Sequence, residues 1–567
     1  MGSPVHELCD AYIERLAALD PTMATQRGLV GHDEELTDYS PEGIASRTEL
    51  DRSTLRALPA LPVESGRDRV AAALLSEWLE SRLALDESGE TSRTLCVLGT
   101  PWQGIRQVFD LMPHESGEDW EKIAARLERV PPSLTGLRAS LDGSARRGLG
   151  PARRQVLACA EQGATWAGRR GRPSFFAGLV AGYTGDDGGL RRRLDAAARS
   201  ATAAYQSASE WMREELAPAA LERDAVGPDR YALASRQHLG AAIDFEETYG
   251  WGWAELHRLE AEMAQEAARI SRGTPLDEVI NLLETDPARA VHGEDALRAF
   301  LQDLMDRTIV ELDGTHFDIP APLRRVEAMI APPGGAAALY YTGPSEDFRQ
   351  PGRTWYPTQG RSVFPLWGEI SVCYHEGVPG HHLQVGQVRY RKEQLTRFQR
   401  TVWIAGHGEG WALYAERLMD ELGHFDRPDY RLGFLRSQLL RAVRVIVDIG
   451  MHLELRIPAG EGVHAGERWT PDVGREFMFA RACFAPDFLA SELDRYLGRP
   501  GQAIAYKVGE RAWLDAREQA RQRLGKQFAL REFHAAALDL GPLGLDQLAG
   551  ECARWSAGVV GADPGAG

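Results

Sequence analysis

The 567-residue sequence predicts a mainly α-helical fold. Apolar residues recur at three- and four-residue spacing through most of the chain, as they do on one face of an α-helix. The apolar–polar alternation of half-buried strands is scarce, and no repeat of 20–50 residues is present that would indicate a solenoid. Together these observations predict an antiparallel array of helices.

The clearest helical periodicity before residue 330 lies in residues 69–88 and 190–215. Short turn signals separate the helices, at Pro131-Pro132, 148–151 and 185–189. Residues 331–365 are rich in Gly, Pro and aromatic side chains and cannot form a long helix. We expect this stretch to form an irregular segment or a short hairpin over a central cleft. Helical periodicity returns at about residue 366 and continues to about residue 550.

No flexible linker divides the chain. The change in amino-acid composition near residue 331 predicts an N-terminal helical half, 1–330, and a second helical half, 331–556. We expect the two halves to form one unit and not to be independent. The Gly-rich residues 557–567 predict a disordered tail.

The charge balance excludes some partners. The chain has 65 basic and 82 acidic residues and a net charge of −17, which disfavours nucleic-acid binding. The six cysteines lie far apart without a CxxC motif, as in proteins of a reducing compartment. The first 21 residues lack the pattern of a signal peptide, and no apolar run is long enough to cross a membrane. We therefore expect a cytoplasmic protein that binds neither nucleic acid nor membranes.

Histidines and glutamates cluster in the second half. The sequence YHEGVPGHHLQ contains His375, Glu376, His381 and His382, and Glu409 follows in GHGEGWALYAE. Two imidazoles and one carboxylate can hold a catalytic zinc with one open position, and an adjacent Glu can act as a general base. The same residues could instead form a helix cap or a buried hydrogen-bonding group.

The histidine spacing requires a distorted helix. In a regular helix His375 and His381 point about 240° apart, and His375 and His382 lie about 10 Å apart. Pro379 removes a helical N–H and Gly380 tolerates unusual backbone angles, so a bulge could bring His381 beside His375. Because His382 needs the larger distortion, we expect it to point away from the metal, toward substrate or a nearby carboxylate.

Other polar residues are candidates for the same site. Arg441, Arg444, Asp448 and His452 follow one helical stripe, where His452 could polarise a carbonyl and Arg444 could bind a substrate carboxylate. A buried structural Arg–Asp pair is the alternative.

Tyr506 and Lys507 follow the Pro500-Gly501 turn. Tyr506 could donate to an oxyanion and Lys507 could bind substrate, or Tyr506 could pack in the core. The loop side chains could bind an anionic or peptidic substrate or pack against the helices; they are Tyr340, Tyr341, Arg349, Arg353 and Tyr356.

Three motifs carry a family resemblance. YHEGVPGHHLQ, EGWALYAE and RYLGRPGQAIAYKVG, in this order, resemble the bacterial proteins grouped as domain of unknown function 885 (DUF 885), as does the opening CDAYIERLAALDPTMATQRG. That family is similar to the zinc carboxypeptidases of the Taq type, which are helical metallopeptidases. The resemblance implies His375, His381 and Glu409 as metal ligands and Glu376 as the base, with two residues inserted between the histidines.

These patterns predict an enzyme, a zinc metallopeptidase or related hydrolase with one zinc per chain. Its expected substrate is a short peptide or peptide-like amide, cleaved by a metal-activated water. Two alternatives stay open: a biosynthetic enzyme that acts on a metabolite amide or ester, and a non-catalytic helical binding protein. The sequence leaves the oligomeric state open, a homodimer included.

Overall fold

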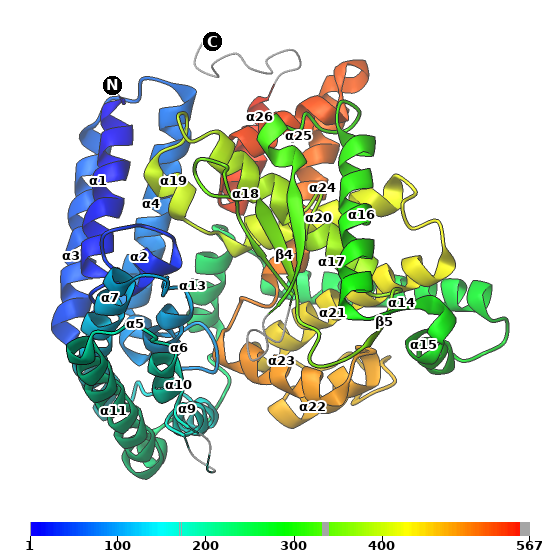
Figure 1. The fold of residues 1–567 in the computed structure, drawn as a ribbon. Coiled ribbons are helices and arrows are strands. Elements are labelled where there is room, and N and C mark those ends of the chain that lie inside the picture. Colours follow the sequence, from blue (N-terminus) through cyan, green and yellow to red (C-terminus); the bar gives the residue numbers. More distant parts are fainter. Residues whose placement is uncertain (1, 169–170, 172, 332–338, 556–567) are drawn as a thin grey trace.

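Helices dominate the structure, as the sequence predicted (Figure 1). The computed structural model describes residues 2–168, 171, 173–331 and 339–555. The predicted tail, 557–567, lies outside these residues, as does part of the predicted irregular segment. No described helix is both long and apolar enough to span a bilayer. All six cysteines are free thiols.

The first helices form an upright group on the left of Figure 1. Their bounds are α1 (Pro4–Leu19), α2 (Pro21–Gln26), α3 (Pro41–Ala57), η1 (Leu58–Ala60), α4 (Gly66–Glu87) and α5 (Glu90–Arg93). Ser3 and Ser40 each cap a helix that starts with Pro, a residue that fits the first helical turn. α1, α3 and α4 share a small apolar core that also receives Phe398 and Ile404 from the second half of the chain.

A second group of helices packs around its own core at the lower left of Figure 1. Its elements are α6 (Pro101–Gln107), η2 (Val108–Asp110), α7 (Gly117–Glu128), α8 (Val130–Arg146), α9 (Arg153–Trp166), α10 (Phe175–Ala181), α11 (Gly188–Trp211), the π-helix η4 (Met212–Leu216) and α12 (Ala217–Ala219). The two segments with the clearest periodicity, 69–88 and 190–215, correspond to α4 and α11.

The remaining elements build the largest core. They begin with α13 (Pro228–Leu239), α14 (Phe245–Ile270), α15 (Leu276–Thr285), η5 (Pro287–Arg289), α16 (Glu294–Leu312) and η6 (Ala321–Arg324). They continue with α17 (Glu369–Glu376), α18 (His381–Tyr390), α19 (Arg397–Thr401), α20 (Ala405–Glu421), α21 (Pro428–Leu453), α22 (Pro471–Arg481), α23 (Pro486–Gly498), α24 (Ala505–Leu524), η7 (Gly525–Gln527), α25 (Leu530–Asp539) and α26 (Leu545–Arg554).

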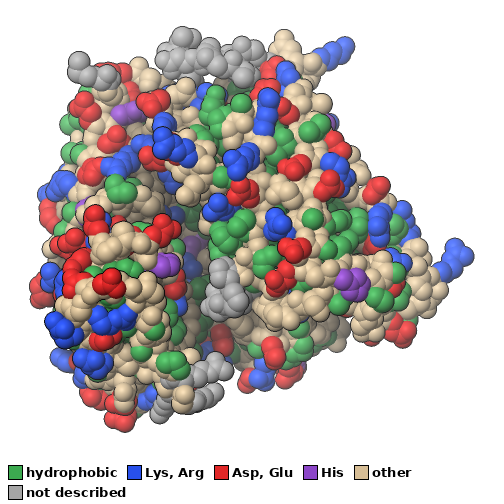
Figure 2. Space-filling view, in the orientation of Figure 1, with side chains coloured by type: hydrophobic (Ala, Val, Ile, Leu, Met, Phe, Trp, Pro, Cys, Tyr) green, Lys and Arg blue, Asp and Glu red, His purple; other side chains and the backbone are tan. Residues whose placement is uncertain are grey.

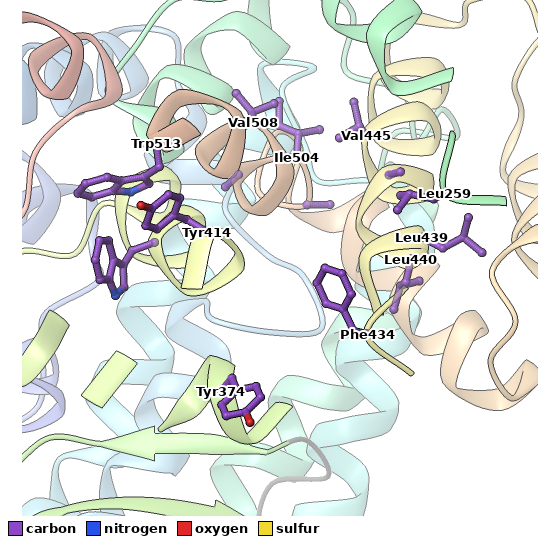
Figure 3. Packing of buried hydrophobic residues seen from close by; sticks show 14 of the residues in the cluster. Leu259, Tyr374, Tyr414, Phe434, Leu439, Leu440, Val445, Ile504, Val508 and Trp513 are labelled. Carbon is purple, nitrogen blue, oxygen red and sulfur yellow. The ribbon is translucent and has the colours of Figure 1, made fainter. Parts of the chain in front are cut away.

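The core of this part crosses the predicted division at residue 330. Leu259 of α14 packs with Leu439, Leu440 and Val445 of α21, and Figure 3 shows these side chains together. One apolar cluster therefore takes side chains from both sides of the division, because α14 and α16 bury their apolar faces against helices of the second half.

The strands form two small sheets. Their bounds are β1 (Ala290–His292), β2 (Val326–Ile330), β3 (Tyr340–Thr342), β4 (Gly352–Tyr356) and β5 (Val363–Pro365). β4 lies between β2, to which it is parallel, and β3, to which it is antiparallel; β1 pairs with β5. The antiparallel β3–β4 pair corresponds to the predicted hairpin.

A cavity of about 1530 Å³ lies between the N-terminal helices and the rest of the molecule. Residues of the first group, Thr25 to Gly28, line it together with β3, α17, α18, α20 and α21. Figure 2 shows the molecule hollowed between these parts. The position of this cavity agrees with the predicted central cleft.

Two glycines let α20 and α24 approach closely. A Cβ atom at Gly410 would overlap the backbone of Gly509, and a Cβ at Gly509 would overlap the carbonyl oxygen of Gly406. Trp513 of α24 and Tyr414 of α20 pack beside this contact (Figure 3). The contact sets the relative position of two helices that both contribute to the cavity wall.

We expect Gly410→Ala to destabilise the protein by about 1–3 kcal/mol, because the added methyl group must push the α24 backbone away. Thermal unfolding followed by circular dichroism measures the change. Gly250→Ala in α14 is the matched control, since a Cβ there meets no atom and the substitution removes helix-destabilising glycine. Equal melting temperatures for Gly410→Ala and wild type would contradict the close-contact account.

Candidate metal centre

A break between two helices creates the site. α17 ends at Glu376 and α18 begins at His381, so the expected single bulged helix is in fact two helices. The Gly380 N–H donates to the carbonyl oxygen of Tyr374, and a Cβ at this glycine would overlap the carbonyl oxygen of His375. Glycine is therefore needed where the chain folds back against the end of α17.

The break brings His381 beside His375. Their ring centroids are 4.9 Å apart. The Nε2 atoms of His375 and His381 lie 3.5 Å and 3.6 Å from Oε2 of Glu409, which α20 contributes. Ligands held about 2.0–2.1 Å from a tetrahedral zinc are themselves about 3.4 Å apart. The two distances to Glu409 thus match the spacing of a zinc ligand set, and all three ligand atoms lie within 4.8 Å of one another.

Hydrogen bonds fix which ring nitrogen faces Glu409. His375 Nδ1 donates to Oε1 of Glu416 at 2.8 Å, and His381 Nδ1 donates to Oε1 of Gln384 at 3.4 Å. Ser371 donates to the other oxygen of Glu416. When an imidazole is neutral with its proton on Nδ1, its Nε2 lone pair faces the carboxylate.

Two lone pairs and a carboxylate oxygen that face one another repel unless a cation or proton lies between them. Burial lowers the pKa of His375, but Glu409 and Glu416 outweigh burial and raise this pKa to about 9. Burial raises the pKa of Glu409, but the two histidines outweigh it and hold that pKa well below its usual range. The site therefore favours a positive charge at its centre, and its donor set fits zinc.

Glu376 lines the cavity at the end of α17, next to His375. Its carboxylate is half-buried, and no described residue gives it a hydrogen bond or an ion pair. The other glutamates of the site are all engaged. A carboxylate free to accept a proton thus lies beside the ligand cluster.

Tyr506 and Arg444 also reach the cavity. The Arg444 guanidinium lies 4.7 Å from the centre of the Tyr506 ring and donates to the hydroxyl of Tyr496 and to Glu492. Burial and the charge of Glu409 raise the pKa of Tyr506, so that its hydroxyl stays protonated.

His382 and Arg353 do not reach the cavity lining. His382 is fully buried, donates from Nε2 to the carbonyl oxygen of Leu323, and accepts at Nδ1 from the hydroxyl of Tyr341. It points away from the ligand cluster, as expected, but toward the backbone and a tyrosine instead of substrate. Arg353 pairs with Glu327 across β4 and β2. The structure supports a substrate-binding role for neither residue.

His452 and Lys507 are structural residues in this fold. His452 is fully buried near the end of α21, where its Nε2 donates to the carbonyl oxygen of Tyr496. Lys507 is buried between Glu255, Glu510 and Gln438. Both are held outside the cavity lining. This corrects the predictions that His452 polarises a carbonyl and that Lys507 binds substrate.

Of the candidate side chains in the segment before α17, some line the cavity and others lie outside it. Tyr340 and Tyr341 line the cavity, whereas Tyr356 is buried in the main core and Arg349 pairs with Asp347. The tyrosines of β3 therefore supply one wall of the cavity.

The sequence did not predict that Gln384 and Glu416 orient the histidines. Gln384 lies three residues after His381 on α18 and donates from Nε2 to Nδ1 of His407 at 3.1 Å. Glu416 lies seven residues after Glu409, two turns along the same face of α20. From the sequence, this spacing indicates that Glu409 and Glu416 lie on one face of a helix. It does not indicate which side chain of another element each carboxylate contacts.

Solved structures resemble this fold over its whole length. A crystal structure of a protein from Colwellia psychrerythraea, described as a putative lipoprotein, has a TM-score of 0.84 at 22% identity and covers 97% of this chain and 98% of its own. A structure from Shewanella oneidensis, described as a putative lipoprotein of unknown function, has a TM-score of 0.74 at 17% identity, with coverage of 97% and 100%. No curated protein matches the chain.

The family model described as "Bacterial protein of unknown function (DUF885)" matches residues 21–551, nearly the full length. The resemblance carried by the three motifs is thereby confirmed, while the similarity to Taq-type carboxypeptidases stays a prediction. This chain belongs to the DUF885 family.

Proposed function

We propose that this protein is a zinc-dependent hydrolase that cleaves an amide bond of a short peptide or peptide-like substrate. The observation that carries the proposal is the convergence of two imidazole Nε2 atoms and the Glu409 oxygen beside the unpartnered carboxylate of Glu376. A metal held by three protein ligands keeps a position open for chemistry, whereas a structural zinc site is usually closed by four.

Zinc, when bound by His375, His381 and Glu409, supplies a Lewis acid that acidifies water and polarises a carbonyl. Glu376 accepts the proton of the attacking water and passes it to the leaving nitrogen. Its freedom from hydrogen bonds leaves both oxygens available for this transfer.

Tyr506 donates a hydrogen bond to the oxyanion that develops on the attacked carbonyl. The raised pKa of its hydroxyl keeps the proton available. The cavity of about 1530 Å³ accommodates a short peptide, and its position between helical groups excludes folded proteins.

Two observations bear on the cellular location. The two similar solved proteins are described as putative lipoproteins, whereas the composition of this sequence favours the cytoplasm. The proposed chemistry requires neither location.

Purified protein should carry about one zinc per chain, and both Glu409→Ala and His381→Ala should lose it, because each removes one of three ligands. Inductively coupled plasma mass spectrometry after dialysis measures the occupancy. His382→Ala is the control: it breaks two buried hydrogen bonds, so it should lower stability and keep the metal. Full occupancy in Glu409→Ala, or metal loss in His382→Ala, would refute the ligand assignment.

Glu376→Gln should fold and bind zinc normally but turn over at least about 100-fold more slowly, since the amide cannot accept a proton. Turnover is measured on the best substrate from a screen of dipeptides, tripeptides and end-blocked peptides, with chelator-treated enzyme as a blank. Unchanged turnover would exclude Glu376 as the base. Absence of any metal-dependent cleavage in the screen would favour the alternatives, a metabolite hydrolase or a binding protein.

Glu416→Gln should weaken zinc binding by about 10- to 100-fold, because the carboxylate that orients His375 and raises its basicity is lost. Competition with a chromogenic chelator measures the affinity. Glu421→Gln, at the far end of the same helix and paired with Arg517, is the matched control and should bind zinc like wild type. Equal affinities for the Glu416 and Glu421 variants would show that Glu416 does not support the site.

A further inference from the structure

One side of the cavity carries a concentration of positive charge. Its residues, the basic wall, are Arg436, Arg441 and Arg444 of α21 and Arg495 of α23. Among the described residues, eight arginines line the cavity against three glutamates. This balance is opposite to that of the whole chain, with its net charge of −17. A reversed local charge at a cavity attracts ligands of the opposite sign.

Arg441 has no acidic partner among the described residues. Its Nη1 donates to the carbonyl and hydroxyl oxygens of Ser437, and its Nε is buried without an acceptor. A half-buried guanidinium that only neutral groups solvate has lost part of its hydration without a compensating charge. One positive charge of the wall is therefore unbalanced.

Arg444 and Arg495 share a single carboxylate. Glu492 accepts from Arg444 at 2.6 Å and from two nitrogens of Arg495 at 3.1 Å and 2.6 Å. The two arginines outweigh the burial of Glu492 and lower its pKa to about 2. Two cations against one anion leave a second positive charge unbalanced. Arg436, by contrast, pairs with Glu284.

The basic wall adjoins the metal centre through Tyr506. The Arg444 guanidinium lies 4.7 Å from the centre of the Tyr506 ring, and Tyr506 lines the same cavity as Glu409. Tyr506 is close enough to Glu409, Arg441 and Arg495 for each of these charges to affect its hydroxyl. Arg441 likewise acts on Glu416, the partner of His375. A group bound at the wall would thus lie beside the cleavage site.

We propose that the basic wall binds two carboxylate groups of the substrate, one at Arg441 and one at the Arg444–Arg495 pair, so that the substrates are acidic short peptides or peptide-like amides with at least two carboxylates. This inference rests on the proposed function for the cleavage step, but not for binding. Arginine suits the task because its planar fork matches a carboxylate. A peptide with neutral side chains offers only its C-terminal carboxylate and leaves one charge uncompensated.

The test compares matched peptides that differ by one charge. Full-length Glu376→Gln protein, as purified, is titrated calorimetrically with Glu-Ala-Ala, Ala-Glu-Ala and Ala-Ala-Glu and with the three corresponding Gln peptides. At least one Glu peptide should bind about tenfold or more tightly than its Gln counterpart, the usual value of a charge-assisted hydrogen bond. Equal binding within every pair, or no binding of any Glu peptide, overturns the proposal.

A second substitution locates the preference. Arg441→Gln in the same background should reduce the Glu-over-Gln ratio to less than about threefold, while Arg475→Gln, on the exposed face of α22, should retain it. If Arg441→Gln does not fold by circular dichroism, Arg495→Gln takes its place. A ratio that survives substitution of the wall arginines also overturns the proposal.

The two proposals fail separately. Tight binding of acidic peptides without cleavage by the wild-type enzyme would refute the hydrolase and leave the basic wall standing. Cleavage of neutral peptides, together with equal binding of the Glu and Gln peptides of every pair, would support the hydrolase and refute carboxylate binding at the basic wall.

Discussion

The indole of Trp411 links the chain segment between α17 and α18 to α20, the helix that carries Glu409. Its Nε1 donates to the carbonyl oxygens of Pro379 and Gly380, at 3.0 Å and 3.2 Å. Carbonyls at a helix break lack the partners that a continuous helix supplies, and leaving them buried and unpaired costs about 1–3 kcal/mol each. Because Trp411 lies two residues after Glu409 on α20, one side chain satisfies the break and holds Glu409 at a set distance from both histidines.

The position of α20 depends in turn on α24. Gly406, Gly410 and Gly509 bring the two backbones into contact, and Trp513 donates to the carbonyl oxygen of His407 beside them. Tyr506 lies in the first turn of α24 and reaches the cavity next to this contact. Glu409, Tyr506 and the spacing between them thus come from one tightly packed helix pair, in which neither helix can shift without overlapping the other.

Negative and positive side chains occupy adjacent regions around the candidate metal centre. Glu409 and Glu416 surround His375 and favour a cation there, while the arginines of α21 and α23 stand behind Tyr506 and favour an anion. Opposite signs in adjacent regions of one cavity orient a ligand that has a polarisable carbonyl next to a carboxylate. The exposed acidic residues of the chain act on this arrangement only weakly, since solvent and salt screen exposed charges.

The sequence by itself predicted the helical class, helices at the positions of α4 and α11, the irregular segment before α17, and the grouping of His375, His381 and Glu409. The helices follow from a local rule, a period near 3.6, and Pro-Gly between two histidines predicts a distortion of the helix, which the structure shows to be a complete break. Only the tertiary structure decided that His452 and Lys507 are buried, that His382 bonds to Tyr341, and that Glu416 and Gln384 orient His375 and His381. The periodicity of a helix tells which side chains share a face, but which element that face meets depends on packing between segments far apart in the chain.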